Sequence, residues 1–292
     1  MVTIGAFDGI HIGHRRILGE VVLLARGLGV RGVAVTFDPH PMSVIQPGEP
    51  PCLLTTTREK AGLIGDLGLD EIAVMRFSPK LAERTAEWFV KNVLLARLNM
   101  RRLVIGYDFR FGRGREGDAS YLKSLGEKYG FGVDIVPPVR YLRHPVSSTR
   151  VRTALVRGDV RSAARMLGRP YSVEGLVSRG EGRGRKLTYP TANLEIEDSR
   201  KMLPSRGIYA VRVATGSGPA PGALYIGTKP TFGGTAESVE VHIIGRKGNL
   251  YGRRLEVAFV ERLRDDAGFK DEAALRKAIA RDIARATKIL ST

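Results

Sequence analysis

The chain has 292 residues, of which 43% are hydrophobic and 26% are charged, and its formal net charge is +17. This length and composition are typical of two globular domains and exclude a disordered chain. No window holds the roughly 18 consecutive apolar residues of a membrane span, and the N-terminus lacks a signal-peptide pattern. Because its single cysteine, Cys52, has no partner for an internal disulfide, we expect a cytoplasmic protein.

The positive charge suits three kinds of partner: nucleic acid, anionic nucleotides and an acidic membrane surface. The basic residues form no long run and are scattered through the chain, with short clusters such as residues 183–186. We therefore expect phosphate-rich small substrates, and neither a membrane nor a nucleic acid as partner. The sequence leaves the oligomeric state open.

The first half alternates short β-branched runs with amphipathic segments, which indicates parallel strands joined by crossover helices. The helical spacing of Ile17, Val21, Leu24 and Leu28 predicts the first crossover helix. We expect a doubly wound, Rossmann-like α/β domain over residues 1–168. Its strands are predicted at residues 2–4, 33–37, 72–75, 103–105 and 133–136.

The pattern changes after Gly168, because the following segments alternate with period two between Gly-rich turns. We expect a small closed β-barrel over residues 169–292. Leu275, Ile279 and Ile283 lie at four-residue spacing and predict a final helix that covers the barrel. The barrel strands are predicted at residues 172–177, 208–213, 224–226, 239–244 and 255–260.

A glycine- and histidine-rich segment, residues 5–14, separates the first strand from the first helix. A helix N-terminus after a parallel strand offers free N–H groups to phosphates, and glycines permit close backbone approach. His11 and His14 are three residues apart and project to one side, so both imidazoles are candidates to hydrogen-bond one nucleotide. This arrangement predicts phosphoryl-type transfer, in which positioning and charge neutralisation supply most of the acceleration.

Two further segments of the first half carry candidate side chains. Residues 147–152 place hydroxyls and arginines at another helix start, where hydroxyls both cap the helix and reach phosphate. Residues 106–112 follow a strand with aromatics and charges, which suits a flat ring. By themselves the two segments are also consistent with a plain N-cap and with a core-and-turn segment.

Together with residues 36–41, these motifs resemble the FMN adenylyltransferase module of bacterial bifunctional riboflavin kinase/FAD synthetases, and the resemblance runs through nearly the whole chain. It implies that His11 and His14 are catalytic. Ala6 stands where the family motif often has Asn, which affects one phosphate or ribose contact. The implied nucleotide-binding residues are Gly5, Phe7, Asp8, Gly9, Ser147, Ser148, Thr149 and Arg152, and the implied flavin-binding residues are Tyr107, Asp108, Phe109 and Phe111.

In the second half, a Gly- and Arg-rich loop precedes Pro190, Thr191, Ala192 and Asn193. Such a loop can wrap phosphates, and a Thr hydroxyl and an Asn carbonyl are hard ligands suited to Mg²⁺. The string by itself is typical of a strand start. It resembles the Pro-Thr-Ala-Asn motif of riboflavin kinases, which implies Thr191 and Asn193 as ligands of Mg²⁺ and Gly182, Arg185 and Thr191 as ATP-binding residues.

The same resemblance implies a catalytic Glu in a later strand, and Glu240 matches it. Strand alternation puts Glu240 and His242 on the face opposite Val239, Val241 and Ile243. A carboxylate there can accept the proton of the ribityl hydroxyl as that hydroxyl attacks ATP. The chain departs from the family pattern at Thr188, usually Gly, and at residues 245–247, where an acid and an aromatic are usual.

The resemblance implies an enzyme that phosphorylates riboflavin to FMN and then adenylates FMN to FAD, with ATP as co-substrate. Two alternatives keep the nucleotidyltransferase chemistry: a monofunctional FMN adenylyltransferase with a degenerate barrel, and a cytidylyltransferase acting on an alcohol phosphate. A third is an RNA-binding protein, but the sequence lacks a stacked-aromatic RNA motif.

Overall fold

The computed structural model describes residues 1–46, 48, 50–179, 189–216, 218–231, 234–246 and 248–291, with the side chains of 229–231 and 234–236 left out. The chain divides into two compact units, Met1–Ser148 and Thr149–Thr292. Among the described residues, no helix is long and apolar enough to cross a membrane.

The first unit is built on a five-stranded parallel sheet with the order β3-β2-β1-β4-β5. All five predicted strands are present, each within one residue of its predicted bounds. The strands are β1 (Val2–Ile4), β2 (Val33–Asp38), β3 (Glu71–Arg76), β4 (Arg102–Gly106) and β5 (Gly132–Val136).

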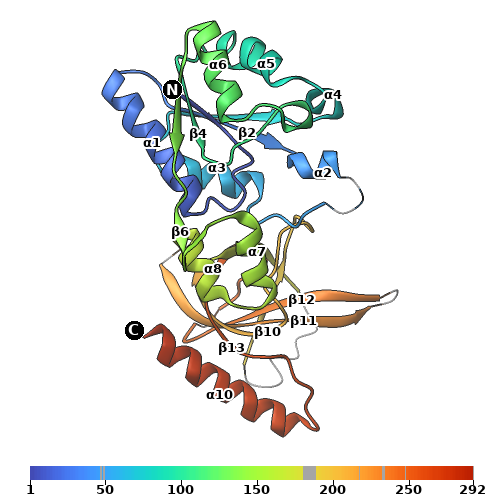
Figure 1. Ribbon diagram of the computed structural model, residues 1–292. Helices are drawn as coiled ribbons and strands as arrows, with labels where there is room; N and C mark the ends of the chain where they lie inside the picture. The colour runs from blue at the N-terminus through green and yellow to red at the C-terminus, as the bar shows by residue number, and fades with distance from the viewer. Residues whose placement is uncertain are drawn as a thin grey trace. The chain divides into compact units, whose positions relative to one another are not determined.

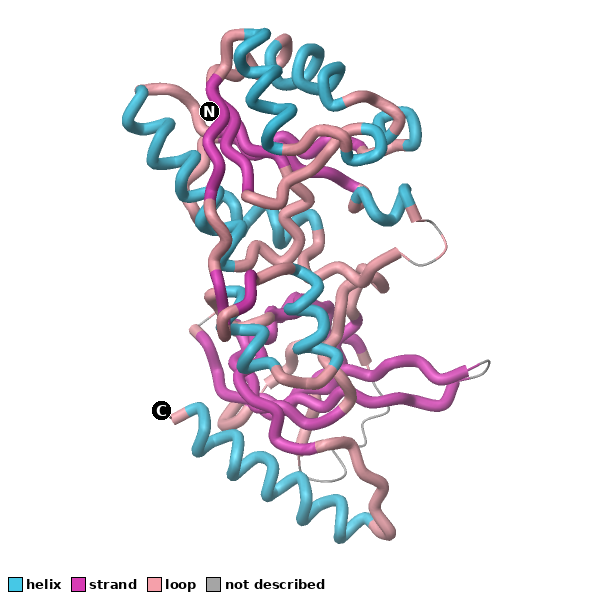
Figure 2. Tube along the Cα trace, viewed as in Figure 1, coloured by secondary structure: helices cyan, strands magenta, loops and turns pink. Residues whose placement is uncertain are grey.

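Helices cover both faces of this sheet, as the prediction of a doubly wound domain requires (Figures 1 and 2). Alternation along β2 shows why: Val35 and Phe37 pack with the helical segments 86–95 and 119–129, whereas Ala34 packs with the first helix. The helical elements are α1 (Ile12–Leu28), α2 (Pro41–Ile45), α3 (Thr57–Gly65), α4 (Pro79–Ala82), α5 (Ala86–Phe89), the π-helix η1 (Val90–Leu95), the 3₁₀ turn η2 (Arg113–Arg115) and α6 (Ala119–Tyr129).

The strand order places the predicted site of this unit. The order reverses between β1 and β4, which pair through Val2↔Leu103 and Thr3↔Val104. Ligands bind outside the carboxyl ends of parallel strands at such a switch point. The loop after β1, which carries the histidines, and the segment after β4, which carries Tyr107, therefore leave the sheet side by side. A short hairpin, β6 (Arg140–Tyr141) and β7 (His144–Pro145), follows β5.

The second unit is a closed antiparallel barrel of order β10-β11-β12-β9-β8-β13, accompanied by helices. The predicted barrel is confirmed, and its interior is filled by alternate strand residues such as Val211, Val241 and Val257, all fully buried. Its strands are β8 (Ser172–Ser178), β9 (Ala192–Glu195), β10 (Gly207–Ala214), β11 (Pro219–Thr231), β12 (Gly234–Ile243) and β13 (Arg254–Arg264), and its helices are α7 (Ser148–Val156), α8 (Val160–Leu167) and α10 (Glu272–Leu290).

The structure adds the place of one strand and the attachment of the final helix to the predicted barrel. The short strand β9 contains the Ala192–Asn193 pair and lies between β8 and β12, so the predicted metal motif is part of the barrel wall. The final helix is present as predicted and runs beside the barrel (Figure 1). Asp282 of α10 accepts three hydrogen bonds at 2.9–3.1 Å from Arg264 of β13, which fixes the helix to the wall.

The helices α7 and α8 pack with the second unit, since α8 contacts β13 and Arg161 pairs with Glu261. The sequence placed both helices before its boundary at residue 168. That boundary stays a prediction.

Candidate active sites

The loop between β1 and α1 is held in an unusual backbone conformation. Phe7, Gly9 and Ile10 all have positive φ, at 48°, 83° and 42°. Such a conformation is strained for the two residues that are not glycine. The side chains of Phe7 and Ile10 are buried in the core beside α1, which holds the strained loop in place. A Cβ on Gly5 would lie 3.0–3.2 Å from the Phe7 ring, so any other residue here would press against that ring.

His11 is the N-cap of α1, because its Nδ1 accepts the His14 backbone N–H at 3.2 Å. An accepting Nδ1 leaves the proton of the neutral ring on Nε2, which is then a donor. Gly13 lies under this ring, since a Cβ there would be 3.1 Å from two ring atoms of His11. The N–H groups of Ile12 and Gly13, in the first turn, are without partners among the described residues.

The two predicted catalytic histidines are brought together. Their rings stack with centroids 3.6 Å apart, and Phe7 meets His14 edge-on at 5.3 Å. His11 is 6% exposed and His14 is half-buried. Burial lowers the pKa of His11 to about 4. Burial also lowers the pKa of His14 well below 6.5, and a proton on His14 would be further disfavoured by the neighbouring His11 and Lys60. Both imidazoles are therefore neutral at pH 7, and they offer hydrogen bonds without positive charge.

Asp8 and Gly9 use their polar groups inside the protein. The Asp8 carboxylate accepts the N–H groups of Leu54 and Thr55 at 3.0–3.1 Å, and Thr55 Oγ1 accepts the Gly9 N–H at 3.0 Å. Asp8 is only 2% exposed. The sequence assigned both residues to the nucleotide, whereas these bonds fasten the loop to residues 54–55 and so shape the site.

Ser148 joins the second predicted phosphate motif to the first, because its hydroxyl donates to the Asp8 carbonyl oxygen at 2.9 Å. This bond places Ser148 beside the histidine loop within the first unit, and the predicted contact of Ser148 with phosphate stays a prediction. Ser147 precedes it directly. Thr149 and Arg152 belong to the second unit, and their place at the phosphates stays a prediction.

Sequence reasoning missed Lys60, a lysine that is only 4% exposed. Its Nζ donates to Thr36 Oγ1 at 3.2 Å and to the Phe37 carbonyl at 3.5 Å, and the Thr36 hydroxyl donates to the Ala6 carbonyl at 3.2 Å. Burial lowers the pKa of Lys60, while Asp8 and Asp38 favour its charged form. The spacing in the sequence could have indicated its burial, because Lys60 and the buried Ile64 lie four residues apart on the inner face of α3.

The predicted flavin segment divides into an exposed and a packed part. Tyr107 is 45% exposed, and Asp108 is exposed without a hydrogen-bond or ionic partner among the described residues. Phe109 and Phe111 stack on each other at 5.4 Å, and Phe111 meets Phe89 of the core at 5.8 Å. The two Phe side chains are thus packed on the protein, whereas the side chains of Tyr107 and Asp108 are open to solvent.

In the barrel, the predicted catalytic carboxylate and the predicted metal motif meet. Glu240 of β12 is the register partner of Asn193 of β9, and Thr191 Oγ1 donates to Glu240 Oε2 at 3.1 Å. Ser238, two residues before Glu240 on the same strand face, donates to its other oxygen at 3.2 Å. Sequence reasoning missed Ser238, although this alternation identifies it. The predicted residues Gly182 and Arg185, and the departures at Thr188 and Lys247, lie outside the described residues.

Two hollows flank this pair. One, of about 290 Å³, lies between the barrel and α10, and Thr191, Glu240, Tyr225 and Phe269 line it together with Leu275, Ile279 and Ile283. The other, of about 450 Å³, is lined by Thr191, Val241, Arg246, Asn249 and Tyr251. Thr191 thus borders both. Leu275, Ile279 and Ile283, whose spacing predicted α10, line the first hollow, so α10 does not pack fully against the barrel at this point.

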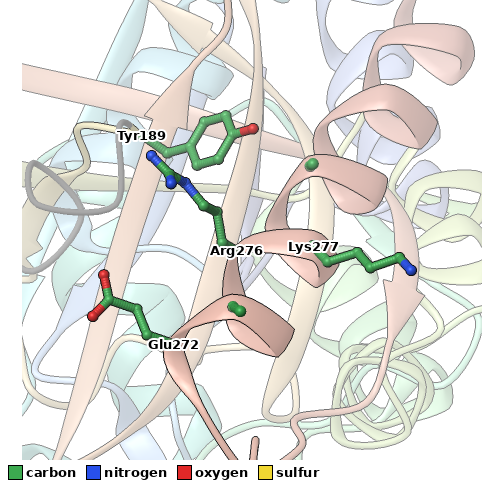
Figure 3. Close-up of a pocket in the computed structure, with 6 residues that line it drawn as sticks. Tyr189, Glu272, Arg276 and Lys277 are labelled. Atoms are coloured by element: carbon green, nitrogen blue, oxygen red, sulfur yellow. The ribbon is translucent and has the colours of Figure 1, made fainter.

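Tyr189 lines both the first of these hollows and a third, of about 530 Å³, whose other lining residues all belong to α10. Its ring meets His242 edge-on at 5.8 Å, and His242 Nδ1 lies 2.9 Å from the Pro190 carbonyl oxygen. Figure 3 shows the Arg276 guanidinium turned toward Tyr189 and the Lys277 side chain turned away from it. Tyr189 is therefore held between a strand residue and α10 at the entrance to the motif.

The first unit is a parallel α/β domain with two stacked histidines at a helix start, and the second is a barrel in which a carboxylate faces a Thr-x-Asn motif. This combination is typical of a two-domain nucleotide-dependent transferase. A family model described as FAD synthetase matches residues 1–150, and one described as riboflavin kinase matches residues 167–290.

Curated relatives match over almost their whole length. The bifunctional riboflavin kinase/FMN adenylyltransferase of Escherichia coli K12 is 35% identical over 97% of this chain and 90% of its own, and that of Pseudomonas fluorescens is 37% identical over 98% and 91%. A crystal structure described as a macrolide-efflux protein from Streptococcus pneumoniae superposes with a TM-score of 0.89 at 31% identity, over 96% of this chain and 91% of its own. The chain belongs to the bifunctional riboflavin kinase/FMN adenylyltransferase family.

Proposed function

We propose that this protein phosphorylates riboflavin at the barrel and adenylates the FMN product at the α/β domain, using ATP in both steps. The observation that carries the kinase half is the hydrogen bond between Thr191 and Glu240 at the border of two hollows. Family membership supports both activities. The single cysteine, Cys52, supports a reducing, cytoplasmic location.

The charges of the two barrel hollows divide the substrates between them. The hollow beside α10 carries the carboxylates of Glu240 and Asp266, while Arg264 is paired with Asp282, and aromatic and aliphatic side chains supply the rest. It suits riboflavin, which is uncharged and largely flat. The hollow with Arg246 and Tyr251 has no carboxylate among its described lining residues and suits ATP.

Glu240 lies where the two substrates would meet. The Glu240 carboxylate accepts the proton of the ribityl 5′-hydroxyl, the oxygen forms a bond to the γ-phosphorus of ATP, and the bond from that phosphorus to the β-phosphate oxygen breaks. The products are FMN and ADP. The hydrogen bonds from Thr191 and Ser238 fix both carboxylate oxygens and so orient the base.

Thr191 and Asn193 are the residues that would hold Mg²⁺. The Thr191 hydroxyl gives its hydrogen to Glu240, which leaves the oxygen lone pairs for a hard cation, and Asn193 is adjacent to Glu240 in register. When bound, Mg²⁺ neutralises charge on the ATP phosphates.

In the α/β domain, the start of α1 holds the phosphates of the second ATP. The free N–H groups of Ile12 and Gly13, together with the ring N–H of His11 and the His14 imidazole, supply neutral donors at the positive end of the helix dipole. An FMN phosphate oxygen attacks the α-phosphorus, and pyrophosphate leaves with the bonding pair of the broken bond. The exposed side chains of Tyr107 and Asp108 would contact the isoalloxazine, and the stacked pair Phe109 and Phe111 beside them supports this role.

A product assay on the full chain tests this division of labour. With riboflavin, ATP and Mg²⁺, we expect the wild type to accumulate FMN and then FAD. His14→Ala should stop at FMN, whereas Glu240→Ala should make no FMN but should convert supplied FMN to FAD. Loss of both products in either variant, with its circular dichroism unchanged, would contradict two separate sites.

A further inference from the structure

Arg246 is a charged residue of the barrel that takes no part in the phosphoryl transfer proposed above. Arg246 follows β12, at the turn that leads to Asn249 and Tyr251, and it lines the 450 Å³ hollow next to Thr191. It is half-buried. Its backbone N–H contacts the Ile243 carbonyl, and its guanidinium forms no ion pair or hydrogen bond with any described residue.

An unpaired, partly buried guanidinium in a hollow without carboxylates is an electrostatic imbalance inside the protein. Several arginines of this unit are compensated by carboxylates: Arg254 pairs with Glu197, Arg264 with Asp282 and Arg200 with Asp198. Arg246 is the charged residue among the described lining residues of its hollow. Partly desolvated cations attract anions more strongly than fully solvated ones, and guanidinium binds phosphate oxygens in a bidentate way.

The hollow has the other features of a nucleotide pocket. Tyr251 offers an aromatic face, which the side chain of Asn249 helps to fix by accepting the Tyr251 N–H at 2.9 Å. Buried aliphatic residues of β8 and β12, Val177 and Val241, form its wall. At its inner border Thr191 touches Glu240. Tyr251, Arg246 and Thr191 thus line one hollow, so a ligand that fills it contacts all three.

We propose that Arg246 determines the affinity of the kinase site for ATP by binding its polyphosphate. This inference rests on the proposed kinase function and adds to it a recognition residue on the turn after β12. The residue faces the hollow assigned to the nucleotide and is absent from the lining of the hollow assigned to riboflavin. Its substitution should therefore alter the response to ATP and leave the response to riboflavin unchanged.

Because both reactions of this protein use ATP, the second reaction is an internal control for nucleotide quality, and the KM for riboflavin is the control for an intact barrel. We would measure the KM for ATP in FMN formation and, separately, in FAD formation from supplied FMN. Arg246→Gln should raise the first value by about 10- to 100-fold, the effect expected for losing a charged hydrogen bond. The second value and the KM for riboflavin should stay unchanged.

Two further variants make the test specific. Arg246→Lys keeps the charge but loses the bidentate geometry, so its KM for ATP should lie between wild type and Arg246→Gln. Arg281→Gln removes a positive charge from the exposed surface of α10, outside the lining of both hollows, and should leave all constants unchanged. Inhibition of the kinase by ADP should weaken in parallel with the rise in KM for ATP.

The outcomes separate this inference from the function on which it rests. If the wild type forms no FMN, the proposed kinase function fails. If it forms FMN and Arg246→Gln shows a KM for ATP within about twofold of wild type, or a changed KM for riboflavin alone, the role of Arg246 is overturned and the kinase function stands.

Discussion

Thr191 Oγ1 lies 3.1 Å from Glu240 Oε2, although 49 residues separate the two in sequence. The contact arises because β9 and β12 are neighbours in the barrel and Glu240 faces Asn193 across the ladder. One hydroxyl can thereby orient the base and offer its oxygen to a cation. The pair gives the kinase half its clearest test.

Thr191→Val keeps the shape of the side chain and removes the hydroxyl. We expect kcat for FMN formation to fall by about 10²- to 10³-fold, the range typical of losing one oriented polar group in an active site. Thr191→Ser should keep most of the activity, and FAD formation from supplied FMN should be unaffected in both. Chromatographic separation of riboflavin, FMN and FAD measures all three.

A double variant with Glu240→Gln shows whether the two residues act as a unit. Groups that act together have strongly non-additive effects, so Thr191→Val should cost little more once Glu240 is lost. If the fold-decrease in kcat of the double variant equals the product of the two single decreases, the two residues act independently, which would contradict the relationship inferred from their hydrogen bond.

The low pKa of His11 predicts a specific pH dependence of stability. Burial favours the neutral ring in the folded protein, with a pKa of about 4 against an ordinary value of 6.5. Between these values the unfolded chain binds more protons, so stability is complete above pH 6.5 and falls as the pH drops toward 4. His11→Asn replaces the Nδ1 cap acceptor by a side-chain oxygen and removes this titration, which is worth up to roughly 3 kcal/mol.

Trp88 is the single tryptophan of the chain and lies in the first unit, so its fluorescence reports unfolding of that unit. Urea titrations from pH 7 to 4.5 should show a steeper loss of stability for wild type than for His11→Asn. Parallel curves for the two proteins would refute a depressed pKa at His11.

Asp8 is expected to act through the fold of the loop. Asp8→Ala would leave the buried N–H groups of Leu54 and Thr55 without their acceptor, which costs about 1–3 kcal/mol for each group. We expect Trp88 fluorescence to show a destabilised first unit and FAD formation to decline, while FMN formation continues. Glu127→Ala removes one exposed negative charge from the same unit and is the matched control.

Lys60 is expected to support the nucleotide loop electrostatically. Lys60→Met keeps the length of the chain but removes the cation that faces Asp8 and Asp38 and the donor to Thr36. The uncompensated carboxylates should repel ATP, so the KM for ATP in FAD formation should rise by about tenfold or more. Lys123→Met, at an exposed position of α6, should have no effect, and an equal rise in both variants would point to a general effect of net charge.

Most elements of the first domain could be predicted because hydrophobic alternation and helical spacing are local properties. Val35 and Phe37 alternate with Ala34, and this pattern alone predicts a strand that is covered on both faces. The start of β9 was recognised at residues 190–193, but its place in the barrel was not, because that place depends on pairing with β8 and β12. The packing of α7 and α8 with the second unit likewise depends on contacts that are remote in sequence.

The site residues divide in the same way. His11 and His14 were identifiable because a helix start fixes their mutual geometry locally, and their rings do stack. Lys60 and Ser238 were missed because each matters only through a partner placed by the fold, Thr36 in one case and Glu240 in the other. For Asp8, the motif identified the position, whereas its acceptor bonds to residues 54–55 show how its side chain is used.

The sequence by itself determined the two-domain order, the doubly wound sheet, the barrel and the residue types of both sites, since these follow from spacing along the chain and from family motifs. Only the tertiary structure decided which polar groups are already engaged, which face a hollow, and that Thr191 borders two of them. The physical reason is that burial and hydrogen bonding depend on distances in space, which strand pairing and packing create between residues far apart in the chain.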